Sequence, residues 1–62
     1  MYRIGDRFWI DGRVYRITGQ SDVYKYGVRK QTIFILEPEA GGLRCACYAS
    51  DLHNYRRLKN DR

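Results

Sequence analysis

The side chains able to do chemistry in this chain of 62 residues are few, and most of them lie near its end. Cys45 and Cys47 are separated by one residue, and the single histidine, His53, follows soon after. Catalysis would require a nucleophile, a base and a shaped pocket, whereas His53 falls in a predicted surface turn. We therefore predict that the protein is not an enzyme.

A zinc site would have to combine Cys45, Cys47 and His53, with Asp51 as a poor fourth ligand. Structural zinc sites usually draw on C-x2-4-C knuckles and four good ligands, so Cys-x-Cys on a strand is a weak match. The extended backbone also holds the two thiols too far apart for a relaxed disulfide. We predict free cysteines that serve as small apolar core residues, with neither a metal nor a cofactor.

Cations interleaved with aromatic rings indicate a different chemistry, the binding of nucleic acid. The rings give bases a stacking platform, and the cations neutralise phosphates. No recognition helix is predicted, which favours RNA or single-stranded DNA over reading of the major groove. The candidate residues form three groups along the chain: Arg7, Trp9 and Arg16; Tyr24, Lys25, Tyr26, Arg29 and Lys30; and Arg56 and Arg57, followed by Lys59.

A protein partner is the alternative, and it would use many of the same residues. Tyr, Trp and Arg are enriched in interface hot spots, and a small phage-type inhibitor or adaptor that docks on a larger host protein would have this composition. Strand edges could also pair between copies to give a homodimer. The sequence leaves these partners open, with nucleic acid ahead of protein. The predicted protein-binding patch comprises Trp9, Tyr24, Tyr26, Phe34 or Leu36, and Tyr48.

The composition limits the class of protein. A length of 62 residues allows one domain with a small core. Twelve Lys and Arg against seven Asp and Glu give a formal net charge of +5, which is compatible with a polyanionic partner. No apolar run approaches the length of a membrane span, and residues 1–6 lack the apolar segment of a signal peptide. We therefore predict a cytoplasmic protein with no membrane partner.

A hairpin over residues 4–18 must position the first basic group. Asp11-Gly12 lies between two apolar-rich runs, which predicts a type I′ turn joining strands over residues 6–10 and 13–18. The two-residue turn sets the register of the pair. The face predicted to lie in the core carries Phe8, Ile10, Tyr15 and Ile17, continued by Ile4 if the strand begins early.

The opposite face of this hairpin is both aromatic and basic. On this face Trp9 is expected to lie opposite Val14, and Arg7 opposite Arg16. Like charges opposite each other on a strand pair are destabilising. Arg7 and Arg16 therefore need solvent, a nearby acid or an anionic partner, and solvent is the simplest answer.

Three further segments follow the hairpin. Residues 20–30 form either a long excursion loop or the continuation of a bent strand, and the sequence does not decide between them. Residues 31–37 are rich in β-branched and aromatic side chains and predict a strand that ends at Pro38. Residues 43–48 alternate, with Leu43, Cys45 and Cys47 on the face predicted to lie in the core.

The last elements are a helical turn and a short strand. Residues 49–54 predict one turn of helix, with Ser50 or Asp51 as its cap and Leu52 as its inward anchor. Residues 55–58 predict the final strand.

Two short motifs, GDRFWIDG at residues 5–12 and YASDL at residues 48–52, add to this order of predicted elements. With five short strands, a long excursion after the second and a helical turn before the last, the chain resembles the Src-homology-3-like small barrels, including the KOW-type and the phage or bacterial versions. The resemblance implies an all-β, five-stranded barrel that binds rather than catalyses. The peptide-binding versions use an acidic excursion loop, whereas here Lys25, Arg29 and Lys30 stand against a single Asp22.

Overall fold

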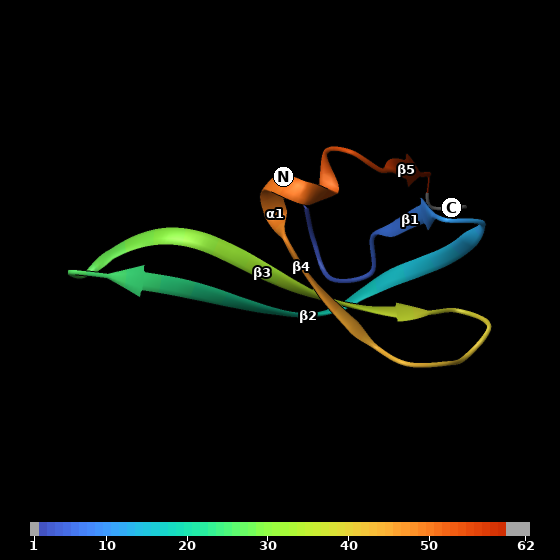
Figure 1. Cartoon of the computed structure of the whole chain (residues 1–62), viewed down its shortest axis with the longest axis horizontal. Helices are drawn as coiled ribbons and strands as arrows, with labels where there is room; N and C mark the ends of the chain where they lie inside the picture. The colour runs from blue at the N-terminus through green and yellow to red at the C-terminus, as the bar shows by residue number, and fades with distance from the viewer. Residues whose placement is uncertain (1, 60–62) are drawn as a thin grey trace.

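The computed structural model describes residues 2–59 as a single antiparallel sheet with one helical turn. The strands follow the order β4-β3-β2-β1-β5, so β4 and β5 are the two edges of the sheet (Figure 1). The all-β prediction is confirmed, and the sheet is open between these edges. The elements are β1 (Arg7–Ile10), β2 (Arg13–Lys25), β3 (Val28–Pro38), β4 (Cys45–Tyr48), α1 (Ala49–Leu52) and β5 (Arg56–Leu58).

The β1–β2 hairpin has the predicted register. Asp11 and Gly12 both have positive φ, 51° and 81°, as a type I′ turn requires, and Trp9 lies opposite Val14. The condition for extending the core face to Ile4, an early start of the first strand, is not met. The chain bends at Gly5, which has a φ of 100° and donates its N–H to the carbonyl of Ile17, so β1 begins only at Arg7 and Ile4 is exposed.

The excursion is the continuation of a bent strand. β2 and β3 pair as far as Lys25 and Val28 and turn at Tyr26-Gly27, where both residues have positive φ. β4 pairs only with Ile33–Leu36, so the far part of β2 and β3 is a ribbon of two strands. We call residues 20–32 the arm. It projects from the rest of the sheet along the 38 Å long axis of the molecule (Figure 1).

The core is small and lies between the sheet and α1. Its buried side chains are Phe8, Ile17, Phe34, Leu36 and Leu52. Leu52 is fully buried, as predicted, and it anchors α1 to the sheet. The predicted caps were wrong, because α1 begins directly after β4 and its N-cap is Tyr48, with no side-chain capping bond. Within residues 2–59, no helix is long and apolar enough to cross a membrane.

The prediction for the face of β4 was only partly right. Cys47 packs against the core, but Cys45 is exposed and Leu43 is 91% exposed. Leu43 lies in the loop before β4, after Gly41 and Gly42, which both have positive φ. Cys45 lies on an edge strand where the open sheet leaves its side chain uncovered. The alternation of residues therefore predicted correctly which face Cys45 and Cys47 share. It could not predict that Cys45 is left uncovered on that face.

Candidate functional site

The outer face of the β1–β2 hairpin carries an acid that the sequence did not reveal. Arg7 Nε donates to Glu39 Oε2 at 2.8 Å, and Arg16 Nη2 donates to the same oxygen at 2.9 Å. The backbone N–H of Glu39 donates to the carbonyl of Val14, which places its side chain between the arginines. The hydrogen bonds from Arg7 and then Arg16 hold the pKa of Glu39 below its usual range. An acid, and not solvent alone, therefore relieves the like-charge pair.

Arg57 also has an internal partner. Its Nη2 donates to Asp6 Oδ2 at 2.7 Å, and the same oxygen accepts the backbone N–H of Arg3. The Arg57 guanidinium lies 5.6 Å from the centroid of the Tyr2 ring. Asp6 is buried and needs such a partner, because an isolated buried charge is costly. Arg57 thus ties the N-terminal segment to β5.

Tyr2 is a structural residue that the sequence did not single out. Its ring packs edge-on against Phe8 and Phe34, with centroids 5.4 and 6.0 Å apart. Its hydroxyl and Nδ1 of His53 are hydrogen bonded at 2.8 Å. His53 is therefore joined to the N-terminal segment. No group of three metal-ligating side chains comes together within residues 2–59.

The tip of the arm gathers the second basic group. Tyr24 and Tyr26 are 62% and 90% exposed, and Lys25 Nζ lies 5.6 Å from the centroid of the Tyr26 ring. Tyr24 lies opposite Arg29 across the ribbon, and Lys30 is next in the chain. None of the three cations forms a salt bridge with an acid among the described residues. The nearby carboxylate of Asp22 instead accepts a hydrogen bond from the Thr32 hydroxyl at 2.9 Å.

The remaining site candidates lie on the body of the sheet. Trp9, 48% exposed, has Arg56 of β5 and Val14 of β2 as its cross-strand neighbours. β1 and β5 lie away from the arm tip (Figure 1). The predicted residues therefore form two separate surfaces. The predicted protein-binding patch also needs correction, because Phe34 and Leu36 are both buried.

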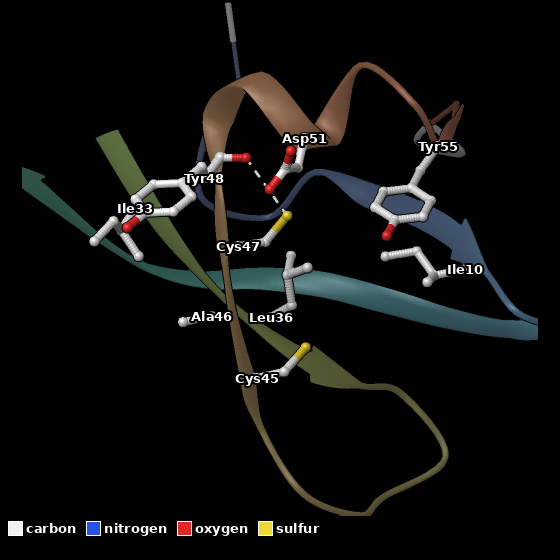
Figure 2. Close-up of a pocket in the computed structure, with 9 residues that line it drawn as sticks. All are labelled: Ile10, Ile33, Leu36, Cys45, Ala46, Cys47, Tyr48, Asp51 and Tyr55. Atoms are coloured by element: carbon white, nitrogen blue, oxygen red, sulfur yellow. Dashed lines mark hydrogen bonds between the residues drawn. The ribbon is translucent and has the colours of Figure 1, made fainter. Parts of the chain in front are cut away.

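A groove of about 460 Å³ opens beside the β4 edge. Figure 2 shows Leu36 between Cys45 and Cys47 on one side and Ile10 and Tyr55 on the other. Sequence reasoning missed this site, since only the open sheet exposes it. We call it the β4 groove, and its lining residues are Ile10, Ile33, Leu36, Cys45, Ala46, Cys47, Tyr48, Asp51 and Tyr55.

The two cysteines of this groove are free but differ in their surroundings. The Cys47 thiol donates to the carbonyl of Tyr48 at 3.4 Å (Figure 2). Burial raises the pKa of this thiol, and the nearby Asp51 carboxylate raises it further. Cys45 is the more exposed of the two. The groove thus combines an apolar floor, two small thiol side chains and one carboxylate.

Comparison of the chain with models of protein families, with curated proteins and with solved structures found no match. The geometry of the described residues therefore carries the functional argument. It offers two distinct surfaces, the cationic and aromatic arm tip and the apolar β4 groove.

Proposed function

We propose that the protein is a small, non-catalytic binding module that takes RNA or single-stranded DNA at the tip of its arm. One observation carries this proposal: Lys25, Arg29 and Lys30 have no acidic salt-bridge partner among residues 2–59, and they stand beside two exposed tyrosines. On the body, in contrast, Arg7, Arg16 and Arg57 are held by Glu39 or Asp6. Arg56, another predicted site cation there, forms no salt bridge among residues 2–59. A phosphate that binds Arg7, Arg16 or Arg57 would have to compete with those carboxylates. At the arm tip, no salt bridge among residues 2–59 competes with it for Lys25, Arg29 or Lys30.

The expected energetics follow from the residues at the tip. A base stacked on a tyrosine ring contributes about 1–3 kcal/mol, and each neutralised phosphate releases counterions. Three phosphate contacts on a single strand give a slope of log affinity against log salt of about −2, or about a twentyfold loss between 50 and 200 mM salt. Single strands suit the site because their unstacked bases can reach Tyr24 and Tyr26.

The order of the elements supports a relation to the Src-homology-3-like small barrels. A helical turn, α1, lies between the fourth and fifth strands, as the resemblance implies. The β4 groove separates the β4 edge from Tyr55, which leads into β5. We propose that the sheet is a barrel of this kind with its seam at the groove.

Fluorescence anisotropy with labelled single-stranded RNA and DNA tests the proposed function. Lys25→Ala should weaken binding and reduce the salt slope by about 0.7. Arg13→Ala is the matched control, because Arg13 and Lys25 are the first and last residues of β2 and both are exposed. Equal losses in the two variants would point to binding that is not confined to the tip. No binding at 50 mM salt would overturn the proposal.

A protein partner is the second candidate, and the β4 groove is the observation that favours it. Its lining is mostly apolar, and among residues 2–59 its single charged residue, Asp51, is an acid. A phosphate backbone would be repelled there. The groove therefore suits a ligand other than the one proposed for the arm.

A further inference from the structure

The β4 groove lies beside a short strand edge that carries no charge and no proline. Among the strands of residues 2–59, β4 pairs with β3 alone, so its other edge is unpaired, although the carbonyl of Tyr48 at its end already accepts the Cys47 thiol. Edge strands are commonly protected by charged side chains or proline. The other edge strand, β5, carries Arg56 and Arg57, whereas the four residues of β4 include no charge and no proline.

The side chains of β4 leave room for those of a partner. In an added strand, alternate side chains point to the same face, so a short segment would direct about two of them into the groove. Cys45 and Cys47 line this face beside Leu36, and their small size leaves the space of about 460 Å³ open. Bulky residues at these positions would fill it.

The charge of the groove lining sets a second requirement for the ligand. Asp51 is the one charged residue lining the groove, it is exposed, and it makes no salt bridge with a cation among residues 2–59. Within a lining that is otherwise uncharged, such an acid favours a cationic ligand group beside it.

From these features we propose that the β4 groove binds an extended peptide segment of another protein. The segment adds as a strand to the unpaired edge of β4 and places alternate apolar side chains against Cys45 and Ile10, which are exposed and partly exposed in the groove. A Lys or Arg of the same segment reaches Asp51. The groove shares Tyr48 with a hollow that Arg29 and Lys30 also line, but its own lining contains no residue of the arm. The proposal does not depend on the function proposed for the arm tip.

Selection of a random peptide library displayed on phage against the immobilised full chain tests the proposal. The enriched peptides should share alternating apolar residues with a Lys or Arg. Calorimetry with a synthetic copy of the strongest peptide should show a loss of about two- to fivefold in Asp51→Asn, the size of an exposed ion pair. Asp22→Asn, which changes an acid on the arm, is the matched control and should bind the peptide unchanged.

Two further readouts locate the peptide. Bound peptide should slow the alkylation of Cys45 by iodoacetamide, because this exposed thiol lies in the groove. Cys45→Trp should abolish peptide binding by filling the groove. Because the position is exposed, the variant should still fold, and its oligonucleotide binding should be unchanged, which separates this test from that of the arm.

Several results would overturn the proposal. They are a library with no enriched peptide, enrichment of acidic peptides, or peptides whose affinity does not respond to Cys45→Trp. A second copy is the competing occupant, since the arm tip itself carries exposed Tyr26 beside Lys25. If sedimentation shows concentration-dependent association that Cys45→Trp abolishes, the groove belongs to another copy of this chain.

Discussion

Replacement of Leu52 by alanine should cost far more stability than the same replacement of Leu43. Leu52 is fully buried against the core, whereas Leu43 is 91% exposed. Leu→Ala removes three carbon groups worth about 0.8 kcal/mol each when buried, and the cavity left behind brings the usual cost to about 2–5 kcal/mol. At Leu43 the change should stay within about 0.5 kcal/mol.

The cost at Leu52 is large for a chain of this size. Typical stabilities of about 0.05–0.15 kcal/mol per residue correspond to about 3–9 kcal/mol for the whole protein. Helix α1 has four residues and no side-chain cap, so it is too short to persist without tertiary packing. Loss of the Leu52 contact therefore releases α1 from the sheet and leaves the fold marginal.

Urea unfolding followed by circular dichroism measures both variants. With a slope of about 1 kcal/mol per molar urea, the midpoint should fall by about 2–5 M for Leu52→Ala and hardly move for Leu43→Ala. If Leu52→Ala is unfolded without urea, trimethylamine N-oxide can restore a folded baseline for the measurement. Equal shifts in the two variants would refute the assignment of Leu52 to the core and of Leu43 to the surface.

Three further changes test other parts of the structure. Glu39→Gln should lower the urea midpoint near pH 7, and the difference should shrink near pH 3, because a carboxyl with a lowered pKa stabilises the fold while ionised and loses this effect as pH falls through that pKa; an equal difference at both pH values would contradict it. Tyr26→Asn should raise stability by up to about 1 kcal/mol, since a tyrosine at a φ of 55° is strained and Asn-Gly suits a type I′ turn. It should also weaken oligonucleotide binding, and thermal melts with anisotropy measure the two effects. Iodoacetamide should modify Cys45 before Cys47, because the raised pKa of Cys47 reduces its reactive thiolate, and mass spectrometry of peptides gives the order.

Local signals predicted the β1–β2 hairpin down to its residue pairs. A two-residue turn at Asp11-Gly12 leaves one antiparallel register, so each opposite pair follows by counting. Leu52 was predicted for a related reason, as the one large apolar side chain in a short polar turn. Both conclusions depend on neighbours close in the chain.

The partners of the basic residues could not be predicted in this way. Glu39 lies 32 residues from Arg7, and Asp6 lies 51 residues from Arg57. Charge counting treats all cations as equally available, but the fold pairs some of them with an acid, whereas Lys25, Arg29 and Lys30 form no salt bridge among residues 2–59. The sequence therefore proposed three groups of aromatic and basic residues without showing which of them share a surface, whereas the structure separates the arm tip from the groups on the body.

By itself, the sequence determined an all-β chain, the register of its first hairpin, the face to which each β4 side chain points and the basic and aromatic character of residues 24–30. The tertiary structure decided that residues 20–32 continue as a paired arm and that Glu39 and Asp6 hold arginines of the body. It also decided that the sheet stays open beside β4, where Cys45 is exposed and a groove forms. The physical reason is that alternation and turn chemistry act between near neighbours, whereas burial and charge pairing depend on which distant segments pack together.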